Sequence, residues 1–439
     1  MVEQLPNGRL RTLMAEAGFT GPELVRRINQ AGAEAGLDLR YQRPSVAQWL
    51  SGGRPRTPVP ELAAEVFTRA LGRRITPAET GLTGHDGHGA QRGDLSAWWQ
   101  RPAADVVADS ARDQPVPPPF DIAALVVPRW PAQASYGTAR PPSGPHRPDL
   151  EDVRSAEAML ALFASADSLL GGGTVRTTVG KYLRHSLAPW LAANTSSGVH
   201  RQLLVVASSV SYLCGFACFD DDLQGTAERH YLTALRLAAE AGTGAGYAVA
   251  LRGLSIQAVH LGHHAAAVTL ADGAVLAAGT GAPRRLQAFL LGQQAVAAAA
   301  DGNRRDAVTA LTAAEENLAL AEGLPGPVGA YHQSAFSFQE AEVRAHAGDR
   351  AGAVRALRTS NRHRPVSERR SRAVVLARLT GLHLDVGQLD DACATTVDFL
   401  DTLPGVSSTR TRIARTALHA RLTPHTEYPP VRALLTLFD

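Results

Sequence analysis

One short segment carries the side chains best suited to recognising a base pair. Glutamine offers a donor and an acceptor that match adenine, and arginine offers two donors that match guanine. Both residue types cluster between residues 40 and 48, and arginines follow at positions 54 and 56, where cations can hold backbone phosphates. The segment therefore predicts a nucleic-acid contact. The candidates for base contacts are Gln42, Arg43, Ser45 and Gln48, and those for phosphate contacts are Arg54 and Arg56.

A short helix is expected to position these groups. Ser45 is a suitable N-cap, and Val46, Trp49 and Leu50 recur at helical spacing, so that they form one apolar face. Two glycines follow and end the helix. With the apolar face turned inward, Gln48 faces outward.

Two helices are expected before this segment and one after it. Asn7 can cap a helix over residues 8–17, which Gly18 ends. Thr20 and Glu23 form a capping-box pattern that begins the second helix, and an insert at residues 29–40 follows it. A later amphipathic helix carries leucine and valine at residues 62, 66 and 71. Further phosphate candidates at the edge of this unit are Arg9, Arg11 and Thr20.

The run S-V-x-Q-W-L-S-G-x-R-P, which begins at Ser45, resembles the recognition helix and following loop of Cro/C1-type (XRE) repressors. The resemblance covers about residues 8–82, and the insert before the recognition helix departs from the compact form. It implies a helix-turn-helix domain that binds a double-stranded DNA operator as part of a transcriptional regulator. Such domains usually read paired half-sites, so a homodimer is expected.

Composition and charge agree with this organisation. Residues 1–82 hold 11 arginines and 8 acidic residues, a surplus of +3 that equals the net charge of the whole chain. A basic surplus confined to one end is expected if that end meets a polyanion. Aromatic residues make up only 5% of the chain, and this favours an all-α fold whose helices pack through small side chains. Residues 83–150 are rich in Gly and Pro, with short tryptophan-containing segments that we expect to dock on a flanking domain.

Residues 151–439 are predicted to form a helical repeat domain. Helices end at glycines near residues 262, 302, 348 and 387, and an alanine-rich helix follows each of them. This is the tetratricopeptide (TPR) pattern with longer and more variable repeats, and it predicts an α-solenoid. The run from Cys218 to Leu237, with Gly171–Thr174 and Lys181–Leu183 before it, resembles actinomycete regulators that join a Cro/C1-type domain to TPR repeats. That resemblance implies a repressor of development or antibiotic production.

The first helix of each repeat is expected to line a concave surface. Polar groups there would suit an extended peptide, although they equally fit an open hydrated groove. The effector could also be a small molecule or a protein partner. The candidate ligand contacts are Arg252, Gln257, Gln287, Gln294, His332, Gln339 and Arg378.

The remaining polar clusters are expected to be structural. The aspartates 220–222 are interpreted as a solvated turn, the arginines at 362–372 as a solvated helix rim, and His260, His263 and His264 as a turn surface. The three cysteines are expected to be reduced, buried residues.

No phosphate-binding loop, nucleophile elbow or metal-ligand set emerges, so no enzyme activity, cofactor or metal is expected. Without a leader or an apolar run of about 20 residues, we expect no membrane contact and a cytoplasmic, nucleoid-associated protein. The alternative function is a TPR interaction scaffold that does not bind DNA.

Overall fold

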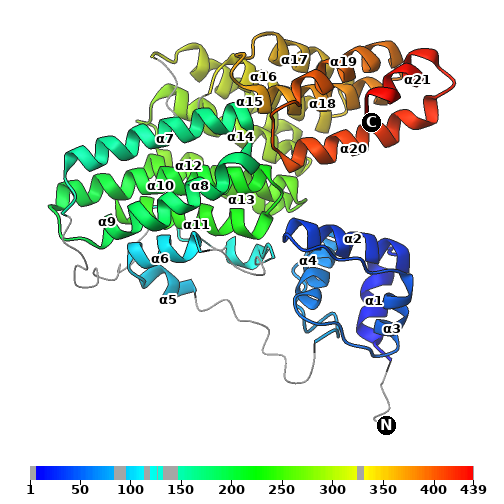
Figure 1. Cartoon of the computed structure of the whole chain (residues 1–439), viewed down its shortest axis with the longest axis horizontal. Coiled ribbons are helices and arrows are strands. Elements are labelled where there is room, and N and C mark those ends of the chain that lie inside the picture. Colours follow the sequence, from blue (N-terminus) through cyan, green and yellow to red (C-terminus); the bar gives the residue numbers. More distant parts are fainter. Residues whose placement is uncertain are drawn as a thin grey trace.

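The computed structural model describes residues 6–83, 95–112, 119–125, 127–131, 147–323 and 331–438. All regular elements in these ranges are helices (Figure 1). An N-terminal domain of four helices is followed by short helical segments and then by helices packed in consecutive pairs, as in a solenoid. The predicted all-α, solenoid-like fold is therefore confirmed.

The N-terminal domain encloses its own hydrophobic core, which contains Leu10, Leu24, Trp49 and Phe67. Asn7 caps the first helix as predicted, because its side chain accepts a hydrogen bond from the amide of Leu10. The four helices are α1 (Gly8–Glu16), α2 (Gly21–Glu34), α3 (Arg43–Leu50) and α4 (Val59–Leu71).

The predicted start of α3 was wrong. The helix begins at Arg43, with Gln42 at the N-cap position and no side-chain cap, so Ser45 lies inside the first turn. Pro44 explains the difference, because proline is tolerated in the first turn of a helix, where its missing N–H needs no partner.

Part of the segment between residues 83 and 150 lies against the solenoid. It contains α5 (Leu95–Gln100), α6 (Ala103–Ser110) and a 3₁₀ turn, η1 (Ile122–Leu125). Trp99 is buried in the solenoid core, and its carbonyl accepts a hydrogen bond of 2.8 Å from Nε of Arg236. The Trp130 ring packs against the Tyr247 ring, with 5.2 Å between their centroids. These segments therefore form part of the solenoid wall.

The solenoid begins with α7 and continues to the C-terminal region. Its helices are α7 (Leu150–Leu170), α8 (Gly172–Tyr182), a π-helical turn η2 (Leu183–Leu187), α9 (Ala188–Ala192), α10 (Ser197–Asp220), α11 (Gln224–Glu240), α12 (Gly244–His260), α13 (His264–Ala278), α14 (Arg284–Ala300), α15 (Arg304–Ala319), α16 (Gln333–His346), α17 (Arg350–Arg362), α18 (Arg369–Asp385), α19 (Leu389–Thr402), α20 (Thr409–Leu422) and α21 (Pro429–Leu435), with 3₁₀ turns η3 (Thr423–His425) and η4 (Thr436–Phe438).

The turns inside successive helix pairs share one geometry. Glycines 262, 302, 348 and 387 all have positive φ, as the glycine punctuation of the sequence predicts. In the α10–α11 turn this position is held by Asp222, at φ +61°, the one non-glycine residue with positive φ in the described ranges. An aspartate tolerates this conformation better than most side chains do.

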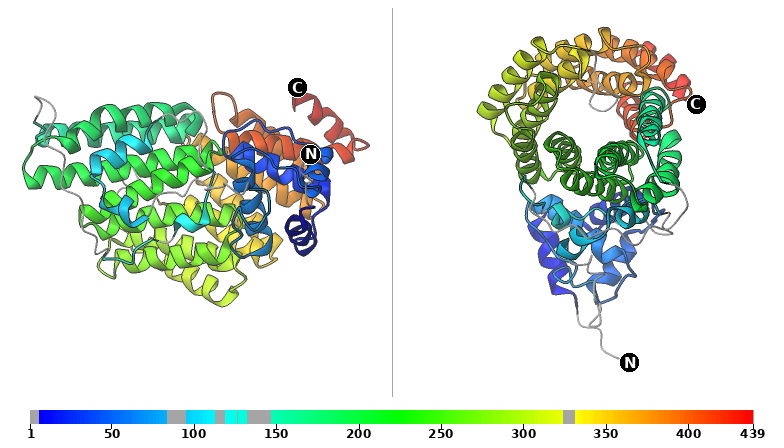
Figure 2. Two further views of the ribbon diagram at one scale, coloured as in Figure 1. Left: turned by 90° about the horizontal axis from the view of Figure 1, so that it is seen from below. Right: turned by 90° about the vertical axis from the view of Figure 1, so that its left-hand side faces the viewer.

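The solenoid curves until its last helices return to its first ones, as the end-on view in Figure 2 shows. At this closure the amide of Ser407 donates to the carbonyl of Leu170 at 2.6 Å, and the amide of Gly173 donates to the carbonyl of Ser407 at 3.0 Å. A Cβ atom on Gly171 would lie 2.4 Å from the Ser407 carbonyl oxygen. Glycine at this position therefore permits the backbones to meet.

Two expectations about charged clusters were wrong because helix packing in the solenoid buries some of their members. Asp220 is fully buried rather than solvated, and its carboxylate accepts from the amide of Gly172 at 3.0 Å. Within the predicted basic rim, Arg364 and Arg370 are both buried. Arg364 pairs with Glu368 at 2.6 Å. These groups hold the solenoid together.

Among the residues that the structure describes, one helix has the length and composition of a membrane span, contrary to our reading of the sequence. It is α10, and 78% of its most apolar window is buried inside the protein. In this fold α10 is a core helix that packs against α7, α8 and α11.

Candidate nucleic-acid interface

The side chains predicted to contact bases lie at the start of α3. Gln42, Arg43 and Gln48 are exposed, and Ser45 is half-buried between them. On the opposite face, Val46 and Trp49 are buried in the domain core. Figure 1 places α3 at the edge of the domain away from the solenoid. One short helix therefore presents a cluster of hydrogen-bonding groups to solvent.

Neighbouring elements fix the orientation of α3. The Trp49 ring meets the Tyr41 ring edge-on at a centroid distance of 5.2 Å. The side chain of Asn29 on α2 holds the backbone of Tyr41 through two hydrogen bonds of 3.0 Å. These contacts pin the segment before α3 to α2. The insert predicted at residues 29–40 was wrong in part, because residues 29–34 belong to α2 and only the segment from residue 35 to residue 42 is a connection.

A tight turn positions the arginines that follow α3. The amide of Gly53 donates to the carbonyl of Gln48 at 2.8 Å, and a Cβ atom on Gly53 would lie 2.7 Å from that same oxygen. Arg54 and Arg56, which come directly after this turn, are exposed. The three remaining phosphate candidates are also exposed. Arg9 donates to the carbonyl of Ala78, and Thr20 caps α2 by accepting from the amide of Glu23.

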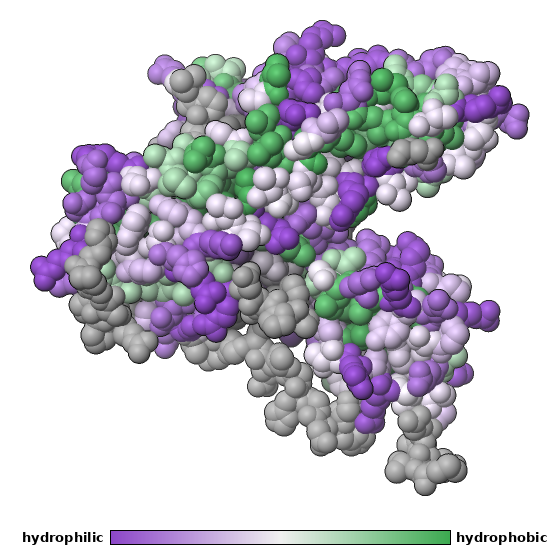
Figure 3. Space-filling model, viewed as in Figure 1, coloured by the Kyte–Doolittle hydropathy of each residue, from purple (hydrophilic) through white to green (hydrophobic). Residues whose placement is uncertain are grey.

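A chain of buried charges connects the N-terminal domain to the solenoid. Nε2 of His263, in the α12–α13 turn, lies 2.7 Å from the carboxylate of Glu65 on α4, and both side chains are only 6% exposed. Arg69 pairs with Glu65 at 2.8 Å and with Glu34 on α2 at 2.7 Å. The Phe120 ring stacks on His263 at 5.3 Å. In Figure 3 a wide notch separates the rest of the N-terminal domain from the last solenoid helices.

The charged side chains between the N-terminal domain and the solenoid stabilise one another. Burial alone would raise the pKa of Glu65, but the hydrogen bond from His263 and the charge of Arg69 outweigh it and lower that pKa. Burial would likewise lower the pKa of Arg69, yet Glu34 and Glu65 raise it. The Glu65 carboxylate and the Arg69 guanidinium are therefore held in their charged forms.

The predicted ligand contacts do not form one open row. Arg252 is buried over the Phe289 ring, 3.5 Å from its centroid, and Gln257 is fully buried, where it donates to the backbone of Gln224 at 2.6 Å. Gln339 is buried and accepts from the Tyr331 hydroxyl at 2.6 Å. Intramolecular contacts also engage the other four candidates: Gln287 with the carbonyls of Thr280 and Ala282, Gln294 with Asp272, His332 with Glu368, and Arg378 with Glu342.

Sequence reasoning missed the residues that join the two domains. Glu65 and Arg69 stand four residues apart on a predicted helix, which indicated only a local ion pair. His263 was interpreted as part of a turn surface. No local pattern connects these positions, because 198 residues separate Glu65 from His263.

The family model described as the SP15 N-terminal domain matches residues 10–83, which take in most of α1 and the whole of α2, α3 and α4. No curated protein matches the chain.

Proposed function

We propose that the protein is a sequence-specific, DNA-binding transcriptional regulator whose solenoid-like domain senses a ligand or a partner. The exposed start of α3 carries this proposal. There Gln42, Arg43 and Gln48 face solvent over a rigid apolar base, and Arg54 and Arg56 follow. This arrangement suits a recognition helix that lies in the major groove, with flanking cations on the phosphates. The TPR-like repeats, the repressor role and the nucleoid location implied by the resemblance belong to the same proposal.

The docking of the two domains supports a regulatory role for the solenoid. A ligand or partner that favours one arrangement of the solenoid would change the interface around His263, and with it the position of α3. One short helix reads only a few base pairs, so we propose that a homodimer presents two copies of α3 to paired half-sites.

The experiment that tests the function is selection of genomic fragments by the purified full-length chain, followed by a shift assay on the enriched sequence. Regulation predicts sequence-dependent binding that weakens steeply with salt. The alternative function, a protein-interaction scaffold, predicts no enriched sequence and no salt-sensitive shift. Selection of no sequence would therefore overturn the proposal.

Replacing Gln48 with alanine should weaken binding to the selected site by about 1–3 kcal/mol, because one bidentate contact to a base is lost. The preference should relax at one base position only. Fluorescence anisotropy with the selected duplex and single-base variants measures both effects. Gln100→Ala, an exposed glutamine on α5, is the matched control. Unchanged affinity and preference in Gln48→Ala would remove α3 from the interface.

Replacing Arg56 with alanine should weaken binding to all sequences alike, because a phosphate contact carries no sequence information. The slope of log affinity against log salt should fall by about one unit. Titrations at several salt concentrations measure it. Arg305→Ala removes the same charge from an exposed site on α15 and should leave the slope unchanged. An equal loss in both variants would indicate only a general charge effect.

A further inference from the structure

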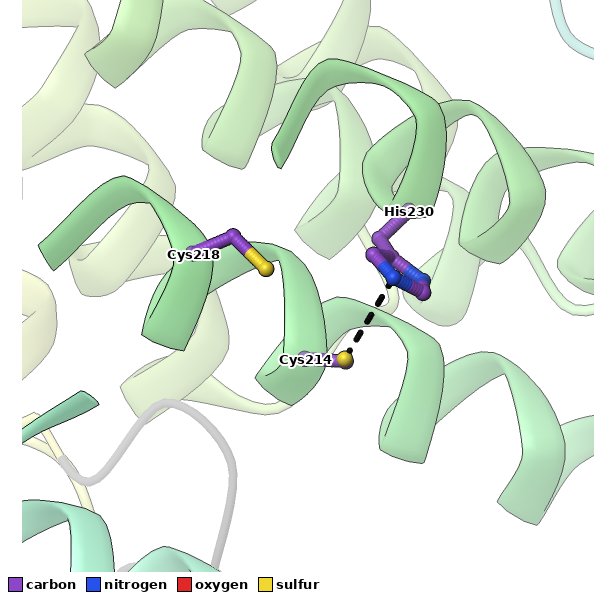
Figure 4. Close-up of side chains that lie close together, drawn as sticks. All are labelled: Cys214, Cys218 and His230. Carbon is purple, nitrogen blue, oxygen red and sulfur yellow. Dashed lines mark hydrogen bonds between the residues drawn. The ribbon is translucent and has the colours of Figure 1, made fainter. Parts of the chain in front are cut away.

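Three soft ligand groups meet inside the α10–α11 helix pair. Cys214 and Cys218 stand one turn apart on α10, and His230 points toward them from α11 (Figure 4). One ligand atom from each residue lies within 4.8 Å of the other two, and all three residues are buried. The sequence showed the cysteine spacing but not the histidine, which the pairing of α10 with α11 brings to the cluster.

The distances match the edges of a metal coordination sphere. Sγ of Cys214 lies 3.4 Å from Nε2 of His230. In a tetrahedral site with Zn–S of about 2.3 Å and Zn–N of about 2.0 Å, the sulfur and nitrogen are roughly 3.5 Å apart. The Cys214 thiol also faces the carbonyl oxygen of Arg176 on α8, at 3.8 Å. The three side-chain ligand atoms therefore need only small shifts to bind one ion.

The chemical state of the groups also suits a metal. His230 supplies an imidazole nitrogen, which zinc accepts as a ligand together with cysteine sulfur. Its Nδ1 atom is buried and has no hydrogen-bond partner among the described residues. A bound cation would supply the counter-charge that two buried thiolate sulfurs need.

We propose that Cys214, Cys218 and His230 form a zinc site that joins α10 to α11. Two thiolate sulfurs and Nε2 of His230 bind Zn²⁺, and the two thiol protons are released to solvent, so the buried complex of one ion and two thiolates is neutral. No electron transfer is involved. Soft sulfur and imidazole ligands favour Zn²⁺ over the hard cations Mg²⁺ and Ca²⁺, which prefer oxygen. The ion would clamp the helix pair whose turn holds Asp222.

Metal analysis of the full-length chain, purified without a histidine tag from zinc-supplemented cells, tests the proposal. We expect about one zinc ion per chain in the wild type and none in Cys214→Ala or Cys218→Ala. Cys393→Ala is the matched control, because this cysteine is also buried but belongs to no such cluster in the described chain, and it should retain the zinc. Removal of the ion by a chelator should lower the midpoint of thermal unfolding in the wild type and the control only.

A titration with Co²⁺ keeps the test decisive if the cluster variants do not fold. The reduced, metal-free wild type and Cys393→Ala should each develop the absorption band of a cobalt–thiolate bond, and stoichiometric Zn²⁺ should abolish it. A wild-type chain that contains no zinc and develops no such band would overturn the proposal. Equal zinc content in Cys214→Ala and the wild type would also overturn it.

Discussion

Replacing Arg370 with methionine should destabilise the closed solenoid by about 3–5 kcal/mol, the typical cost of removing one partner from a buried ion pair. The Arg370 guanidinium lies 3.2 Å from the carboxylate of Asp167 on α7 and 3.8 Å from that of Asp220 on α10. It also lies over the Phe216 ring. Arg370 comes from α18, so it joins the last part of the solenoid to the first. Its loss would remove a close counter-charge from two buried carboxyl groups.

The loss of stability in Arg370→Met should be larger at high pH than at low pH. Burial raises the pKa of Asp167 to about 6, although Arg370 opposes that shift. The folded protein therefore binds a proton at this carboxyl more tightly than the unfolded chain does, where the pKa is about 3.9. The stability that this proton provides is present below pH 4 and is lost as the pH rises through 6. Without Arg370 the pKa rises further, so the destabilisation should be larger at pH 8 than at pH 5.

Urea unfolding of the full-length chain at both pH values measures the effect. Arg358→Met is the control, because its partner Asp391 lies 3.0 Å away but both side chains are about half exposed, so this pair should contribute less than about 1 kcal/mol. Changing Asp167 and Asp220 to asparagine in the Arg370→Met background should restore part of the stability. Equal losses in Arg358→Met and Arg370→Met, or a loss independent of pH, would contradict this account of the closure.

Local signals predicted much of the fold. The cap at Asn7, the apolar face of Val46 and Trp49, and the glycine turns of the repeats each depend on residues close together in the sequence. The α-helix satisfies its backbone hydrogen bonds within one segment, so such patterns suffice to place it. The exposure of Gln48 followed from the same periodicity.

Long-range contacts determine which polar side chains are buried, and local sequence patterns did not predict this burial. Arg370 looked like part of a solvated basic rim, and its burial depends on Asp167, which lies 203 residues earlier. The curvature that brings these two together sums small rotations at every repeat, and no single segment encodes it. The prediction that polar residues line an open concave surface was wrong for a related reason. Gln257 has the spacing of a groove residue, but its neighbours bury it.

Replacing His263 with alanine should release the N-terminal domain from the solenoid. The change removes the buried hydrogen bond to Glu65 and the stacking with Phe120, while Glu65 keeps its ion pair with Arg69 inside the N-terminal domain. Breaking a buried pair of this kind costs about 3 kcal/mol, which would shift the ratio of docked to undocked molecules by about 100-fold. Small-angle scattering should show a more extended molecule, and protease should cut faster between the domains.

The same contact should weaken in acid. The lowered pKa of Glu65 means that its contribution to docking is present above the ordinary carboxyl pKa, about 4.3, and is lost as the pH falls through the lowered value. Scattering profiles of the wild type should therefore expand on acidification, whereas His263→Ala should already be extended at neutral pH.

The neighbouring substitution His264→Ala is the control for undocking. Nδ1 of His264 has no hydrogen-bond partner among the described residues, so its removal should leave scattering and cleavage as in the wild type. If docking also restrains the proposed recognition helix, affinity for the selected DNA should change in His263→Ala and not in His264→Ala. Unchanged scattering in His263→Ala would show that other contacts hold the domains together. Extended molecules with unchanged DNA affinity would instead separate docking from regulation, because the α3 surface would then act independently of the solenoid.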